Sequence, residues 1–118
     1  MTYEEIKRLL KTSIGSRFLG RKEVKELPSI LWEDEIPKNL VGGNGILVVT
    51  DKRLIFINKG IFSLKVKYFL HEEVSYIEEI PRITTGEIVV YAGEEKAKIK
   101  RVDRTVLRMF LTRLESKD

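Results

Sequence analysis

Between residues 36 and 100, short apolar segments alternate with short clusters of turn-forming residues, and this alternation limits the fold more than any other feature. The clearest case is Ile46–Val49 and Leu54–Ile57, two apolar runs separated only by Thr50–Arg53. Four polar residues suffice for a tight reversal, and the Asp51 side chain can bond its own backbone to nucleate it. We therefore interpret the two runs as neighbouring antiparallel strands joined by a hairpin.

The same pattern predicts five further strands. Gly42–Gly45 separates a strand at Ile36–Val41 from the one at Ile46–Val49, and Gly60 marks the corner after Leu54–Ile57. Because an Asn-Gly pair accepts positive φ angles at both central turn positions, we expect a tight hairpin at Asn44. The remaining strands are predicted at Leu64–Leu70, Val74–Ile80, Glu87–Ala92 and Lys96–Lys100.

Both ends of the chain are predicted to be helical. Thr2 and Glu5 match a capping box, which favours a helix from Tyr3 to about Ser13. A short helix around Arg21–Glu26 and a helical turn after Pro28 would complete an N-terminal leader. Asp103 is expected to cap a C-terminal helix. The apolar stripe of that helix consists of Val106, Leu107, Phe110, Leu111 and Leu114.

Seven short strands with hairpin spacing and one closing helix define the expected fold class. It is mainly β with α: a seven-stranded bent antiparallel barrel or sandwich, capped at one end by the C-terminal helix. One compact domain fits 118 residues. We place an N-terminal helical extension at residues 1–26 and the domain itself at 27–118.

Composition excludes several classes of chemistry. The chain has no cysteine and one histidine, so thiolate sites and multi-histidine metal sites are excluded. Neither G-x-S-x-G nor G-x-x-x-x-G-K-[ST] occurs. We therefore predict a protein that is not an enzyme, with no catalytic residues, cofactor or metal, and interpret His71 as a solvated turn residue. No apolar stretch is long enough to span a bilayer, and the charged N-terminus is unlike a signal peptide. We expect a cytoplasmic protein, at most peripheral to a membrane.

Two segments of the chain resemble the bacterial PH-like (pleckstrin-homology-like) domains. The more specific is the G-x-L-x-x-T-D-K-R-L-I-F run at Gly45–Phe56, and the second is L-x-x-x-V-S-Y-I-E at Leu70–Glu78. The resemblance covers about residues 27–116. It implies a bent seven-stranded barrel closed by its final helix, and a binding module without shared chemistry. Relatives of this kind bind phosphoinositides, proteins or peptides, and some form ring-like oligomers.

The sequence departs from the lipid-binding PH domains at the loop that grips phosphates. Its equivalent loop, Gly42–Gly45, is short and uncharged, with Lys38 as the nearest cation. A headgroup clamp needs several converging cations. We therefore do not expect specific phosphoinositide binding.

Basic residues are concentrated in two segments of a chain whose formal net charge is +4. Such segregation favours a basic binding surface, although the same charges would also serve simply to solvate the outer faces of strands. The candidate residues are Lys52, Arg53, Lys59, Lys65, Lys67, Lys96, Lys98 and Lys100. Nucleic acid is not expected as a partner, because no aromatic residue interleaves with the lysines of residues 96–100 to stack on bases.

Two functional hypotheses follow. The first is a non-enzymatic module that binds a protein or peptide partner, or a second copy of itself, through a barrel edge or the groove beside the C-terminal helix. The second is a peripheral binder of anionic membranes that uses Lys52, Lys59, Lys65 and Lys67. An exposed tip at Ile61-Phe62 would support the second hypothesis, but we expect these two side chains, like Trp32, to pack onto the core.

Overall fold

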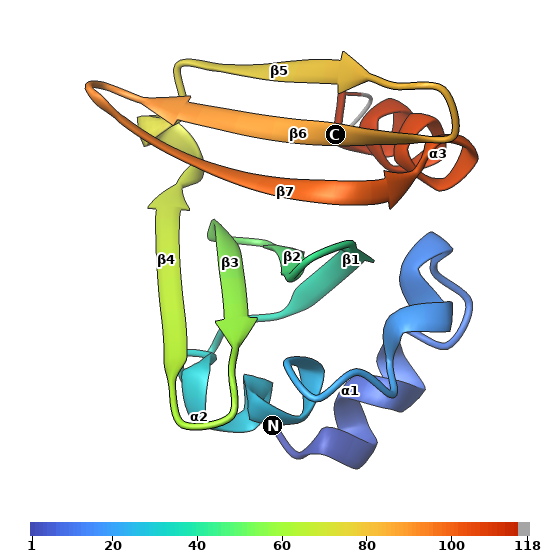
Figure 1. Cartoon of the computed structure of the whole chain (residues 1–118). Helices are drawn as coiled ribbons and strands as arrows, with labels where there is room; N and C mark the ends of the chain where they lie inside the picture. Colours follow the sequence, from blue (N-terminus) through green and yellow to red (C-terminus); the bar gives the residue numbers. More distant parts are fainter. Residues whose placement is uncertain (116–118) are drawn as a thin grey trace.

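The computed structural model describes residues 1–115 and shows two antiparallel sheets whose strands run across one another (Figure 1). Sheet 1 has the strand order β1-β2-β3-β4, and sheet 2 has the order β5-β6-β7. The strands are β1 (Pro37–Gly42), β2 (Ile46–Thr50), β3 (Arg53–Lys59), β4 (Leu64–Leu70), β5 (Tyr76–Pro81), β6 (Thr85–Ala92) and β7 (Glu95–Asp103). The predicted mainly-β fold with seven strands is confirmed.

The main core lies between the two sheets and beneath the C-terminal helix α3 (Arg104–Glu115). Phe56 of sheet 1 and Ile88 of sheet 2 meet there, and Leu107 and Phe110 of α3 close one end. Each large apolar side chain buried in this way contributes about 1.5–3 kcal/mol to folding. Asp103 caps α3 as expected, since its Oδ1 accepts a hydrogen bond from the Val106 amide at 3.1 Å.

A second core lies on the opposite face of sheet 1, where the N-terminal leader packs. The leader consists of α1 (Tyr3–Leu9), the 3₁₀ turns η1 (Ile14–Phe18) and η2 (Val24–Glu26), and α2 (Leu27–Ile30). Its fully buried Ile6, Val24 and Leu27 contact Ile55 and Ile57 of β3. Sheet 1 is therefore the middle layer of three, and the leader covers a face that would otherwise be exposed (Figure 1).

The first helix is shorter than its sequence pattern predicts. The capping box is confirmed, because Thr2 and Glu5 exchange both expected hydrogen bonds, but α1 ends at Leu9 rather than Ser13. The chain then docks on β1, where the Gly15 amide donates to Asn39 Oδ1 at 3.2 Å. A Cβ at Gly15 would lie only 1.9 Å from the Leu40 carbonyl oxygen, so this close approach requires glycine.

The turn between β1 and β2 also differs from expectation. Asn44 does not adopt a positive φ; within residues 1–115 only Arg101 and Gly93 do. Instead, the Asn44 amide donates to the Lys100 carbonyl at 2.8 Å, and Asn44 Oδ1 accepts from the Lys100 amide at 2.9 Å. These two hydrogen bonds hold the turn against β7 at one corner of the sandwich. The conformation of the turn is therefore fixed by a tertiary contact and not by the φ preference of Asn44.

Candidate interaction surface

Strand β4 forms a free edge of sheet 1. It pairs with β3 on one side, and no strand within residues 1–115 pairs with its other side (Figure 1). The backbone groups of such an edge can accept a further strand. Its side chains alternate as predicted, but the apolar face is not well covered: Leu64, Val66 and Tyr68 are 43%, 40% and 44% exposed. We call β4 with these exposed side chains the β4 edge.

The apolar face of β4 is open because the leader stops short of it. Val66 and Tyr68 lie directly opposite Ile57 and Ile55 in the β3–β4 register. Ile55 and Ile57 are fully buried by the leader, whereas their β4 neighbours are not. The second core therefore ends at β3. The neighbouring apolar side chains of β4 lie on the same face of sheet 1 but are exposed to solvent.

A buried arginine supports the aromatic part of this edge. The guanidinium carbon of Arg53 lies 3.8 Å from the ring centroid of Trp32 and 4.4 Å from that of Tyr68. The two rings meet edge to face, with centroids 5.5 Å apart. Both rings are partly exposed, Trp32 at 40%, so the prediction that Trp32 belongs to the core is wrong.

The assignment of Arg53 to a basic surface is also wrong, because its side chain is only 2% exposed and pairs with buried Glu35. Nε and Nη2 of Arg53 each donate to a Glu35 carboxylate oxygen at 2.8 Å, and Nη2 also donates to the Ile30 carbonyl. A guanidinium held in this planar, two-pronged way has a fixed orientation. The aromatic pair is therefore held in place by the interior of the protein.

Glu35 is ionised in this network. Burial acts to raise the pKa of its carboxyl group, but hydrogen bonds from Arg53, Thr50 and the Trp32 amide outweigh that effect and hold the pKa below its ordinary value. Thr50 Oγ1 donates to Glu35 at 2.6 Å and accepts from the Arg53 amide at 2.9 Å. The polar residues 50–53 thus form a hairpin, as predicted, and also anchor the segment that carries Trp32.

The lysines of β4 line a small opening between the two sheets. Lys65, Lys67 and Lys98 of β7 are among the residues that line a cavity of about 160 Å³. Lys98 is opposite Val89 in the register, whereas its neighbour Ile99 is opposite the core residue Ile88, so the Lys98 side chain lies on the outer face of sheet 2. Lys67 Nζ lies 3.3 Å from a carboxylate oxygen of Glu95 and donates to the Lys96 carbonyl. Lys65 forms no ion pair within residues 1–115, whereas Lys67 is paired with Glu95. The inner side of the β4 edge is therefore basic, with Lys65 as the lysine that has no ion-pair partner in the described chain.

The remaining predicted lysines do not join this group into one surface. Lys52 pairs with Asp51 at the β2–β3 corner, whereas Lys59 pairs with Glu26 at the opposite end of β3. Lys96, Lys98 and Lys100 follow β7 in sheet 2, and Lys96 lies opposite Tyr91 in the register. The eight predicted residues therefore do not form one surface. Arg53 is buried, Lys52 and Lys59 lie at opposite ends of β3, and the other five lysines are divided between β4 of sheet 1 and β7 of sheet 2.

The hairpin between β3 and β4 ends in an exposed apolar tip. Ile61 is 89% and Phe62 is 99% exposed, so the prediction that both fold back onto the core is wrong. The Gly60 amide donates to the Ser63 carbonyl at 2.9 Å and closes the turn below them. We call these two residues the β3–β4 tip.

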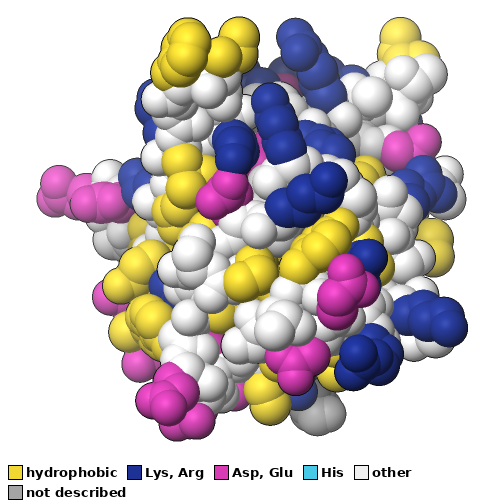
Figure 2. All heavy atoms as spheres, turned by 90° about the horizontal axis from the view of Figure 1, so that it is seen from below, with side chains coloured by type: hydrophobic (Ala, Val, Ile, Leu, Met, Phe, Trp, Pro, Cys, Tyr) yellow, Lys and Arg dark blue, Asp and Glu magenta, His cyan; other side chains and the backbone are white. Residues whose placement is uncertain are grey.

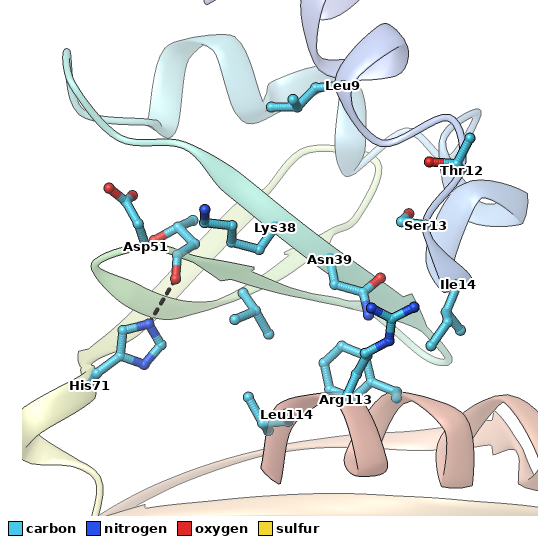
Figure 3. A pocket seen from close by; sticks show the side chains of 13 residues that line it. Leu9, Thr12, Ser13, Ile14, Lys38, Asn39, Asp51, His71, Arg113 and Leu114 are labelled. Atoms are coloured by element: carbon cyan, nitrogen blue, oxygen red, sulfur yellow. Dashed lines mark hydrogen bonds between the residues drawn. The ribbon is translucent and has the colours of Figure 1, made fainter. Parts of the chain in front are cut away.

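A hollow of about 670 Å³ lies between the leader, β1 and the end of α3 (Figure 3). Three of its polar residues, Asn39, Asp51 and His71, are engaged by contacts within the protein. His71 Nε2 is 2.7 Å from the Thr50 carbonyl, and Asp51 Oδ1 accepts from the Ile36 amide at 2.8 Å. Asn39 Oδ1 accepts from the Gly15 and Leu40 amides. The groove beside α3 thus holds elements together, and His71 is half-buried rather than solvated.

Comparison with known families agrees with this architecture. A family model described as "Bacterial PH domain" matches residues 2–115, which is nearly the whole chain. The chain belongs to the bacterial PH domain family. The match includes the leader, whereas the resemblance noted in the sequence begins near residue 27.

Two solved structures share the fold of this PH domain. One is a pleckstrin homology domain from Shewanella amazonensis SB2B, with 16% identity and a TM-score of 0.58, over 73% of this chain and 79% of that one. The other is a DUF1696-family protein with a pleckstrin-homology domain from Shewanella loihica PV-4, with 18% identity and a TM-score of 0.55, over 75% and 88% of the two chains. No curated protein matches the sequence.

PH domains are generally interaction modules without enzymatic activity, and the family match indicates no catalytic family. Within residues 1–115, no three histidine, aspartate or glutamate side chains come together as a metal site. No helix in the same part of the chain is long and apolar enough to cross a bilayer. The exposed surfaces of this PH domain are therefore where a function should be sought.

Proposed function

We propose that this PH domain binds an extended segment of a partner protein, which adds a strand to sheet 1 along β4. The observation that carries this proposal is the free β4 edge, whose side chains from Leu64 to Tyr68 are exposed and alternate between apolar and basic. In strand addition, backbone hydrogen bonds supply affinity, and the alternating side chains of the added strand supply specificity.

The chemistry of the edge defines the partner segment. Side chains of the added strand that fall on the outer side would meet Leu64, Val66 and Tyr68, and should be apolar. Those on the inner side would meet Lys65 and Lys67 and should be acidic. The preferred segment therefore alternates apolar and acidic residues.

Preorganisation supports this site over the groove beside α3. The Trp32–Tyr68 pair is fixed by buried Arg53, and rigid aromatic residues lose little conformational entropy on binding. In the groove, Asn39, Asp51 and His71 already bond to the protein itself. A ligand there would have to replace those contacts.

A charge-swap experiment tests the proposal. Two ten-residue peptides, one alternating valine with glutamate and one alternating valine with lysine, would be titrated into the isotopically labelled 118-residue chain. We expect the glutamate peptide to bind at least about tenfold more tightly, because like charges facing each other across an interface cost several kcal/mol. Its amide shift changes should concentrate on residues 64–70.

The reversed variant Lys65→Glu/Lys67→Glu should prefer the lysine peptide instead. The matched control, Lys11→Glu/Lys22→Glu, changes two exposed leader lysines by the same total charge and should retain the preference of the wild type. If neither peptide shifts the β4 amides, or if the control reverses the preference equally, strand addition at β4 is excluded.

A further inference from the structure

The β3–β4 tip has no role in binding at the β4 edge, and its two adjacent side chains are among the most exposed large apolar groups of residues 1–115. Ile61 and Phe62 are adjacent in sequence and project from the end of a hairpin. A protruding apolar tip offers no concave surface for a ligand, whereas a fluid lipid layer can accept it without a matching pocket. Isolated exposed apolar residues need no explanation, but an adjacent pair of this size at a hairpin apex does.

Positive charge surrounds the tip. Lys59 ends β3 beside it, and Lys65 follows it in β4. Glu26 of the leader pairs with Lys59, which brings the neighbouring exposed Lys25 to the same end of the molecule. Figure 2 shows the face on which this end lies, with several lysine and arginine side chains gathered near projecting hydrophobic groups.

Lys59 is paired with Glu26 at this end of the molecule, so these two charges offset each other. Lys25 and Lys65 are exposed and form no ion pair within residues 1–115, so the net charge around the tip is positive. An apolar tip ringed by cations matches the two layers of an anionic membrane surface, in which headgroup charges lie above acyl chains.

We propose that the β3–β4 tip docks this PH domain onto anionic lipid bilayers: Ile61 and Phe62 enter the acyl boundary while Lys25 and Lys65 face the headgroups. Lys52 takes no part, because it lies at the other end of β3. In this orientation β4 rises away from the bilayer, and its free edge remains open to a partner segment (Figure 1).

Vesicle flotation tests the proposal, with vesicles of mixed phosphatidylglycerol and phosphatidylcholine compared with phosphatidylcholine alone. We expect the wild type to float with the anionic vesicles, and Ile61→Ser/Phe62→Ser to lower the partition coefficient at least about tenfold. The matched control is Ile83→Ser, because Ile83 is 92% exposed but lies between β5 and β6 of sheet 2. It should float like the wild type.

Two further readouts separate insertion from surface attraction. Lys25→Glu should weaken binding several-fold in low salt and less in high salt. In a Trp32→Phe background, the tryptophan of Phe62→Trp should be quenched by brominated lipids, whereas that of Ile83→Trp should not. Because all these sites are exposed, the variants should retain the circular dichroism of the wild type.

Three outcomes would overturn the proposal: no flotation of the wild type, an equal loss with Ile83→Ser, or an unquenched Phe62→Trp on bound protein. If Ile61→Ser/Phe62→Ser converted a dimer to a monomer without changing vesicle binding, the tip would be a contact between two copies of the chain, and the membrane proposal would be overturned as well. Failure here leaves strand addition at β4 untouched, since Ile61→Ser/Phe62→Ser should still bind the glutamate peptide.

Discussion

Arg53 illustrates what a sequence can and cannot show about a single residue. In the sequence it stands in a run of basic residues after Asp51, where a surface cation is the natural interpretation. Its partner, Glu35, lies 18 positions earlier, and strands β1 and β2 stand between them in the sequence, so no local pattern connects the two. The cation becomes buried because the fold brings a carboxylate and two aromatic rings to it, and such pairing cannot be read from spacing.

The Glu35–Arg53 pair predicts a specific dependence of stability on pH. The pKa of Glu35 is lower in the folded state than its ordinary value of 4.5. The pair therefore stabilises the fold fully above about pH 4.5, and this contribution is lost as pH falls through the lowered pKa of the folded state. Urea denaturation should show the free energy of unfolding of the wild type falling in that acidic window.

Glu35→Gln should remove most of this acid dependence and cost about 3–5 kcal/mol at neutral pH, because it leaves Arg53 buried without its counter-charge. The control is Glu33→Gln, an exposed neighbour that should change the free energy of unfolding by less than about 0.5 kcal/mol. An unchanged pH profile in Glu35→Gln would show that the buried pair does not govern acid stability.

At the scale of elements, periodicity located the strands and the closing helix well. The runs at Ile46–Val49 and Leu54–Ile57 became β2 and β3, and the stripe containing Leu107 and Phe110 packs as expected. Periodicity cannot show which alternating face is covered by another element. The apolar face of β4 was predicted to be half-buried and is largely exposed, since the leader reaches only to β3. The sequence therefore predicted β4 as a strand, but it did not predict that the apolar face of this strand is exposed.

The leader is one of the three packed layers, so substitutions of its buried residues should lower the free energy of unfolding, and α1 offers both a buried residue and an exposed control. Ile6 of α1 is fully buried against sheet 1, whereas Leu9 is 47% exposed. Ile6→Ala should lower the free energy of unfolding by about 2–5 kcal/mol, since it leaves a cavity in the second core. Leu9→Ala should change it by less than about 0.5 kcal/mol. Urea titrations at one pH would measure both.

Equal effects of the two substitutions would mean that α1 does not pack on sheet 1 in solution. The boundary at residue 26 would make residues 27–118 a domain that folds without the extension, whereas the packing of the leader on sheet 1 predicts that it does not, and truncation tests which holds. Removing residues 1–26 would uncover Ile55 and Ile57. We expect the shortened chain to aggregate or lose cooperative unfolding, because this apolar face of sheet 1 would have no cover.

At the scale of the whole molecule, sheet 1 joins two hydrophobic cores. Phe56 faces the core shared with sheet 2 and α3, while its neighbours Ile55 and Ile57 face the core shared with the leader. Successive residues of one strand thus belong to different cores, as the period of two requires. Neither core can lose its packing without disturbing β3, so the three layers should unfold together.

This coupling predicts a single transition that different probes report identically. Trp32 fluorescence senses the Arg53 contact beside sheet 1, and far-ultraviolet circular dichroism senses all the strands and helices. Ile55→Val in the leader core and Ile88→Val in the inter-sheet core should each cost about 0.5–1.5 kcal/mol, and each should move both probes to the same lower urea midpoint. The two costs should add in the double variant within about 0.5 kcal/mol, because the sites lie in separate clusters. If Ile55→Val shifted only the fluorescence transition, the leader core would unfold separately from the rest of the sandwich. The contacts of Arg53 with Trp32 and Tyr68 would then be lost from the β4 edge while the two sheets remained folded.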